Sequence, residues 1–271
     1  MKKLFILLLF NCICFAQNKQ GIVNYGFIKS LFYGNKSEEE FNALLKFDPK
    51  QSYFVTEKDS LENPNQEIEQ YKIIEIKRDN GQSEKKGIIN ISSSTNDAGN
   101  QVYFNRAKDS IWSYIKNMKG MYVAEKNTGF NWKLEKGQKE IGSYTCNKAT
   151  TTYKGRTYTA WYTLEIPLSY GPWKFNGLPG LILEAYDTEY KIYYFFKNIE
   201  YPLKKEIKID FIKESIEEPF IKWYSYKQYL TEANSSLENA YETMLIMFKE
   251  KGWTHKPIMP NIEQQRIEIA E

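Results

Sequence analysis

Cys146 is the side chain in this sequence with the widest choice of chemistry. The chain has three cysteines, and the other two, Cys12 and Cys14, lie in its apolar N-terminal segment. As a lone thiol, Cys146 could act as a nucleophile, a metal ligand or a site that pairs with a partner. A nucleophile of this kind normally needs a base, and the single histidine, His255, is far away in the sequence. A small thiol buried in the core is therefore the favoured interpretation.

Arg156 is the second candidate, because a guanidinium group can clamp a carboxylate or a phosphate with its fork of donors. It follows a tight turn at Lys154-Gly155. The alternative is an ion pair with Glu184 or another carboxylate of the same sheet. No cluster of His, Cys, Asp and Glu has metal-ligand spacing, so we expect no metal and no cofactor. Phosphate-binding loops and hydrolase motifs are also absent from the sequence, and nothing in it indicates catalysis.

The N-terminus has the pattern of a signal peptide over residues 1–16. Two lysines precede an apolar run that ends in Cys14-Phe15-Ala16, a small-x-small cleavage site. The run is shorter than the roughly 20 residues that a membrane anchor needs, and no later window is apolar enough, so we expect no integral membrane protein. Cleavage removes two of the charges behind the net +3. A nearly neutral mature chain argues against nucleic-acid binding and fits a location in the periplasm or outside the cell, with outer-membrane association left open.

Aromatic residues make up 16% of the chain and favour strands. Alternating apolar positions predict short strands over residues 23–28, 41–47, 52–56, 73–76, 87–91, 102–105, 110–116, 121–126, 130–134, 143–153, 156–165, 180–187 and 190–199. Residues 37–47 could instead begin a helix, since Ser37 to Glu40 has capping-box spacing, but the following turn favours a hairpin. So many short strands predict an antiparallel meander that curls like half a barrel.

Residues 222–251 carry apolar side chains at three- and four-residue spacing and end at Gly252. This pattern predicts one amphipathic helix or two, whose apolar face must lie on the sheet. The expected fold class is therefore α+β, mainly β: a curled antiparallel sheet covered by one or two C-terminal helices. We expect a single domain over residues 17–256, followed by a polar tail, ordered or frayed, over residues 257–271.

The connection between the strands predicted at 156–165 and 180–187 is aromatic, which is unusual for a surface loop. It carries Tyr170, Trp173 and Phe175, and the breaks Gly171-Pro172 and Leu178-Pro179-Gly180 interrupt any sheet pairing. Such a loop either plugs the open end of the curled sheet or lines a cleft. Filling the core is the more common fate of apolar loop residues.

The block Gly177-Leu178-Pro179-Gly180-Leu181-Ile182 resembles the motif that gives the GLPGLI family its name. The resemblance extends over about residues 140–200 and includes Cys146-x-Lys148-Ala149, Gly155-Arg156, Ala160-Trp161-Tyr162 and Gly171-Pro172-x-Lys174-Phe175. It implies an exported, single-domain protein of Bacteroidota, in a family without an established activity. More weakly, the strand pattern is similar to the periplasmic lipoprotein-carrier fold, in which a curved antiparallel sheet wraps helices and holds acyl chains.

Three functions are compatible with these features. A non-catalytic binding or carrier protein of the bacterial envelope, with an apolar or peptide-like ligand, predicts a lined cavity. An accessory subunit of an outer-membrane transport system predicts a closed core with an exposed apolar patch. An enzyme predicts an accessible Cys146 near a base, with Arg156 orienting the substrate. We expect the first. The candidate ligand- or partner-binding residues are Cys146, Arg156, Trp161, Tyr170, Trp173, Phe175 and Leu178, with Gly171, Pro172, Gly177, Pro179 and Gly180 shaping the loop.

Overall fold

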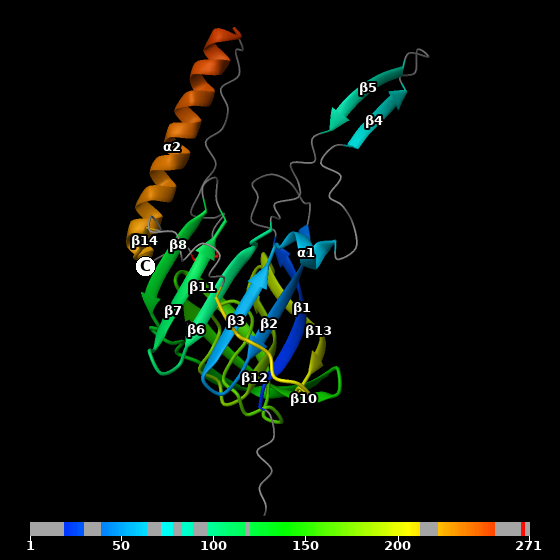
Figure 1. Ribbon diagram of the computed structural model, residues 1–271, viewed down its shortest axis with the longest axis vertical. Coiled ribbons are helices and arrows are strands. Elements are labelled where there is room, and N and C mark those ends of the chain that lie inside the picture. The colour runs from blue at the N-terminus through cyan, green and yellow to red at the C-terminus, as the bar shows by residue number, and fades with distance from the viewer. Residues whose placement is uncertain are drawn as a thin grey trace, which may run out of the picture.

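The fold is built on one twelve-stranded sheet, which the computed structural model shows as an open, curled sheet (Figure 1). The structure describes residues 19–29, 39–63, 72–77, 83–88, 97–116, 120–211, 222–252 and 267–268. One half of the sheet contains Gly21–Lys29 (β1), Glu39–Phe47 (β2), Gln51–Thr56 (β3), Asn100–Asn105 (β6), Ser110–Ile115 (β7) and Met121–Lys126 (β8). The other half contains Lys133–Ile141 (β9), Tyr144–Tyr153 (β10), Arg156–Thr163 (β11), Leu181–Asp187 (β12) and Ile192–Glu200 (β13).

The two halves are separate antiparallel meanders that meet where β1 pairs with β13. The first strand of the chain therefore lies in the middle of the sheet, whereas a single continuous meander would place it at an edge. Alternation in the sequence indicates which face a residue occupies but not which strand it pairs with. Register shifts in the β1–β13, β9–β10 and β11–β12 pairs are bulges of the kind that bend a sheet, and they accompany the curl.

Smaller elements complete the described part of the chain. A separate hairpin of Lys72–Lys77 (β4) and Ser83–Ile88 (β5) is inserted between β3 and β6, after a short helix, Asp59–Glu62 (α1). Trp223–Tyr224 (β14) adds to β8 in parallel and leads into the single long helix, Tyr226–Glu250 (α2). None of the described helices is both long and apolar enough to cross a membrane.

The main core lies inside the curl, between the inner faces of the two halves. Val23, Tyr25 and Phe27 alternate along β1 and are fully buried there, as the period of a strand requires. The Tyr25 hydroxyl donates a hydrogen bond to the Ile182 carbonyl on β12, with 2.6 Å between the oxygens. The stacked rings of Phe27 and Tyr194 lie 4.6 Å apart. The α+β, mainly β class with a curled antiparallel sheet and a C-terminal helix is thus confirmed.

Helix α2 packs on one edge of the sheet rather than across it. Its first two turns place Tyr229 and Ala233 against Met121 and Val123 of β8, and the rest of the helix projects away (Figure 1). The helix begins at Tyr226, later than the predicted 222, because Ser225 forms a capping box with Gln228.

The strand predicted at residues 130–134 is displaced: β9 begins at Lys133. The two rings before it are used for packing instead of strand pairing. Phe130 lies 4.3 Å from Tyr153 and Trp132 lies 6.0 Å from Phe175, measured between ring centroids. The segment 37–47 is strand β2 from Glu39 onward. Asp79-Asn80-Gly81-Gln82, a sequence typical of a turn, lies outside the described residues.

Gly180, at the end of the connection between β11 and β12, is required by a close backbone approach. A Cβ atom there would overlap the carbonyl oxygen of Thr163. We expect Gly180→Ala to lower the free energy of unfolding by about 3 kcal/mol, the upper range for overpacking, measured by urea denaturation. The control is Gly129→Ala, where φ is +71° but no atom lies within 4 Å of the new Cβ. It should cost only about 1 kcal/mol, from backbone strain alone. Equal losses in both variants would contradict the close approach.

Candidate functional site

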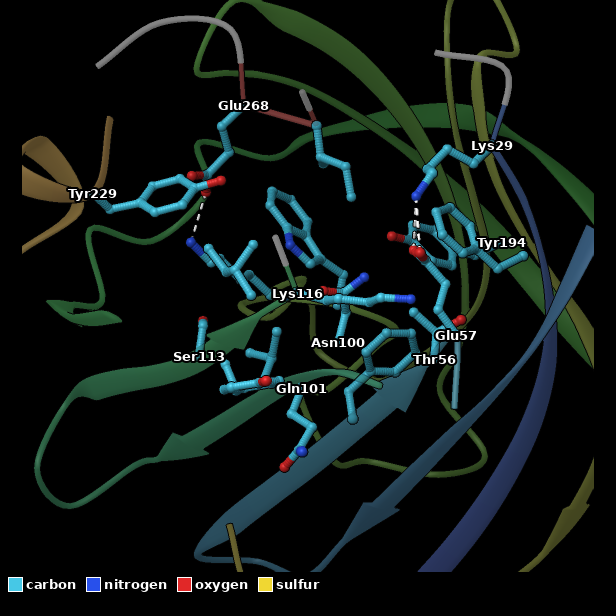
Figure 2. A pocket seen from close by; sticks show the side chains of 18 of the residues that line it. Lys29, Thr56, Glu57, Asn100, Gln101, Ser113, Lys116, Tyr194, Tyr229 and Glu268 are labelled. Carbon is cyan, nitrogen blue, oxygen red and sulfur yellow. Dashed lines mark hydrogen bonds and ion pairs between the residues drawn. The ribbon is translucent and has the colours of Figure 1, made fainter. Parts of the chain in front are cut away.

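A pocket of about 210 Å³ lies on the inner face of the curled sheet. Strands β1, β3, β6 and β7 form its floor. Its roof consists of the aromatic loop (residues 164–180, between β11 and β12), the first turn of α2, and residues 267–268 near the end of the chain. Figure 2 shows Ser113 and Tyr229 toward one side of the pocket and Lys29, Glu57 and Tyr194 toward the other.

The apolar wall of the pocket is made of closely packed rings and branched side chains. It contains Phe27, Phe54, Val102, Ile115, Trp173 and Tyr194. Phe54 meets Tyr194 edge to face, with 5.8 Å between ring centroids, and Tyr194 stacks on Phe27. Because these rings hold one another in place, this wall is formed before any ligand arrives.

Polar groups at one end of the pocket are already engaged with one another. Lys29 forms an ion pair with Glu57, with 2.9 Å between nitrogen and oxygen. Glu57 is almost completely buried and has a φ of 55°, a backbone conformation that bulky residues rarely adopt. The backbone N–H of Lys116 donates to the side-chain oxygen of Asn100. Burial lowers the pKa of the Lys116 ammonium, while Glu57 and Asp59 oppose that change.

Four charged residues, two of them buried and two half-buried, connect the roof to the sheet, and we call them the four-charge cluster. They are Glu125 of β8, Lys154 of the β10–β11 turn, Lys174 of the aromatic loop and Glu268. Lys174 contacts both Glu125 and Glu268, the latter at 2.8 Å. Lys154 lies 3.2 Å from Glu125 and 3.5 Å from Glu268. Two cations and two anions compensate each other, which burial of such groups requires.

Tyr226, the first residue of α2, lies beside this cluster. The Lys154 ammonium sits 3.6 Å from the centroid of its ring, within range of a cation–π interaction. Burial, followed by the charge of Glu268, raises the pKa of the Tyr226 hydroxyl far above its ordinary value. The cluster therefore connects the helix as well as the loop and the C-terminal residues to the sheet.

The structure brings one of the seven predicted binding residues, Trp173, to the pocket. Its φ of 54° is unusual for a bulky residue, so the surrounding packing must hold it there. Tyr170, Phe175 and Leu178 are buried in the main core beside it, where they plug the curl. The loop thus fills the core and also lines a cavity. Glycines and prolines of the loop shape its path, with Gly171 pressed against Ile182.

The other three predicted residues lie elsewhere. Cys146 is fully buried in the main core, and burial raises the pKa of its thiol to about 12. Trp161 is half-buried beneath the ammonium of Lys139, 4.6 Å from the ring centroid. Arg156 borders a second, polar pocket of about 300 Å³. Its guanidinium pairs with Asp187 of β12 at 2.9 Å, which is another carboxylate of the same sheet, while Glu184 pairs with Lys139.

Sequence reasoning missed most of the pocket. Lys29, Glu57, Ser113 and Glu268 lie in segments far apart in the sequence, and no motif connects them. The sequence around Lys174 could have indicated its role, because a lysine between Trp173 and Phe175 in an apolar loop needs a buried partner. Among the described residues, no group of three or more His, Cys, Asp or Glu could hold a metal ion.

Comparison with known proteins places one segment of the chain in a family model. Residues 151–184, which contain most of the aromatic loop, match Porph_ging, described as a protein of unknown function and associated with Bacteroidota. A search of curated proteins finds no match to the chain.

Solved structures of two proteins show distant likeness to this chain. Two crystal forms of PNGF-II each match with 12% identity and a TM-score of 0.47, covering 79% of this chain and 32% of theirs. This chain therefore spans about a third of the PNGF-II chains. The LolA superfamily protein NE2245 from Nitrosomonas europaea matches with 6% identity and a TM-score of 0.27, covering 68% of this chain and 86% of its own. At such low similarity neither carries an argument about function.

The four-charge cluster predicts a loss of stability in acid. Burial alone would raise the pKa of Glu268, but Lys174 and Lys154 hold it below its usual range. A carboxyl group whose pKa is lower in the folded chain stabilises the fold above its usual pKa and loses this effect as the pH falls through the lowered value. Glu268→Gln should therefore be less stable than the wild type at pH 7, and the difference should shrink toward pH ~3. Urea denaturation at several pH values measures it.

Glu189→Gln is the matched control for that experiment, because Glu189 forms an exposed ion pair with Lys191. It should leave the free energy of unfolding almost unchanged at every pH. A Glu268→Gln difference that stays constant from neutral to acid pH would show that the charge of Glu268 does not stabilise the fold.

Burial predicts that Cys146 is unreactive in the folded protein. Iodoacetamide at pH 8 should leave the native chain unmodified and label it completely in guanidinium, as mass spectrometry can show. The control is Cys146→Ala combined with Thr145→Cys, since Thr145 is the exposed neighbour on the opposite face of β10. This variant should be labelled without denaturant. Fast labelling of native Cys146 would contradict its burial and would favour a nucleophilic role.

Proposed function

We propose that this chain is a non-catalytic binding or carrier protein of the bacterial envelope that holds a small, mostly apolar ligand in the roofed pocket. The observation that carries the proposal is the pocket itself, with a preformed aromatic wall and polar groups at its ends. The signal-peptide pattern of residues 1–16 and the resemblance to the exported GLPGLI family support a site of action in the periplasm or outside the cell. The burial of Cys146 gives the enzyme alternative no support.

The size of the pocket decides between kinds of apolar ligand. A cavity of about 150 Å³ binds benzene, which corresponds to about 25 Å³ for each non-hydrogen atom. The pocket of about 210 Å³ then takes about eight such atoms. A sixteen-carbon acyl chain would leave about half of its carbons outside. A small molecule, or one apolar side chain of a peptide, fits better than a lipid.

The accessory-subunit alternative has one observation in its favour, a row of rings on β12, β13 and the turn between them. Tyr190 is 55% exposed and stacks on Tyr186, with 4.5 Å between ring centroids, and Tyr193 meets both. An outer-membrane protein could bind this row without using the pocket. A cavity would then have no role, and for this reason we prefer the ligand-binding function.

Native mass spectrometry of the mature protein, purified gently from the envelope of a producing bacterium, tests the proposal. We expect an additional mass of roughly 100–150 Da, equivalent to about eight non-hydrogen atoms, that disappears on denaturation. Val102→Phe, which extends a side chain of the pocket floor into the cavity, should abolish this mass while the protein stays folded. Leu134→Phe is the control, because Leu134 is 61% exposed on β9. A bare wild-type polypeptide would count against the proposal.

A further inference from the structure

Ser113 is a buried polar group that faces the pocket without a hydrogen-bond partner among the described residues. It lies on β7 between Ile111 and Ile115 and is 2% exposed. In the sheet its neighbours are Val102 of β6 and Val123 of β8, so its surroundings are apolar. Leaving such a hydroxyl unpaired is costly, and natural proteins seldom do so without a reason.

Other polar side chains around the pocket either have a hydrogen-bond or ion-pair partner or point away from it. The Thr56 hydroxyl donates to the Asn42 carbonyl at 3.0 Å, and Glu57 is bound by Lys29. The side-chain oxygen of Gln101 also has no partner among the described residues. However, its neighbour Val102 faces the pocket, so strand alternation places the Gln101 side chain on the other face of β6. Ser113 is thus the polar group on the pocket floor that is placed to receive a ligand.

Each charged side chain that lines the pocket already has an opposite charge beside it, which argues for a neutral ligand. Lys29 pairs with Glu57, Lys174 pairs with Glu125 and Glu268, and Lys116 interacts with Glu57 and Asp59. A charged ligand would bring an uncompensated charge into a largely buried site, where it is disfavoured. The rings of Phe27, Phe54, Trp173 and Tyr194 suit edge and face contacts with another ring.

We infer that the pocket binds a small neutral molecule, mostly apolar and aromatic, whose single hydroxyl or carbonyl group forms a hydrogen bond with the hydroxyl of Ser113. This inference rests on the proposed binding function and specifies its ligand class and its polar anchor. Since a serine hydroxyl both donates and accepts, alcohols and ketones are equally suitable.

Calorimetric titration of the full mature chain tests the inference with three probes of similar size: ethylbenzene, 2-phenylethanol and phenylacetate. The decisive quantity is the effect of Ser113→Ala on each dissociation constant. We expect the variant to bind 2-phenylethanol about fivefold more weakly, the effect of one lost hydrogen bond. Binding of ethylbenzene should not change. Phenylacetate should bind more weakly than 2-phenylethanol to the wild type.

Three variants make the result specific. Ser113→Thr keeps the hydroxyl and should retain the wild-type response to 2-phenylethanol. Ser113→Cys keeps nearly the same volume with a weaker donor and should lose affinity for the alcohol even if the alanine variant is poorly folded. Ser110→Ala, on the same strand, removes a hydroxyl that donates to the Lys108 carbonyl and should leave all three dissociation constants unchanged.

The outcomes separate the two proposals. Ethylbenzene and 2-phenylethanol could both bind the wild type while Ser113→Ala changes their dissociation constants by the same factor. Ser113 would then not be the polar anchor, and the binding function would stand. Tighter binding of phenylacetate than of 2-phenylethanol would overturn the neutral ligand class. If none of the probes binds, both this inference and the proposed function fail. We also expect Ser113→Ala to melt at the same or a higher temperature, since it removes an unpaired buried hydroxyl.

Discussion

The four-charge cluster is the interaction on which the closed form of this molecule depends. Glu125, Lys154, Lys174 and Glu268 come from a strand, a turn, a loop and the C-terminal region. Each contacts opposite charges, and Lys174 and Glu268 are buried. Burying any one of them alone would be strongly unfavourable. The segments that carry them must therefore come together as a set. Trp173, next to Lys174, and Ile267, next to Glu268, then line the pocket.

An open curled sheet needs such a roof, because its inner face is apolar and water would otherwise reach it. The aromatic loop supplies Phe175 and Leu178 to the main core, and α2 supplies Tyr229 at the edge. These side chains fill most of the space, and the pocket remains where the floor carries the small Ser113 between larger residues. The roof thus accounts for both the stability of the curl and the presence of a site.

Local patterns predicted the elements well because the relevant forces act locally. The alternation of Val23, Tyr25 and Phe27 indicated a strand with one buried face, and Cys146 was expected in the core, where it lies. Pairing of β1 with β13 could not be predicted, since register and partner depend on distant residues. For the same reason the sequence indicated only that Arg156 could pair with a carboxylate of the sheet, and the structure shows that this carboxylate is Asp187. Glu268 was expected in a polar tail, and only its contact with Lys174 reveals its place at the site.

The segment that matches the family model, residues 151–184, binds residues 267–268 through several of its polar side chains. The side chains of Arg156 and Tyr158 both donate to the Ile267 carbonyl at 3.1 Å, and Lys174 binds Glu268 next to it. Its polar residues therefore hold the roof in place. Ser113, which we infer to recognise the ligand, lies outside this segment. In this chain, the residues that attach the roof and the residue that we infer to recognise the ligand therefore lie in different segments.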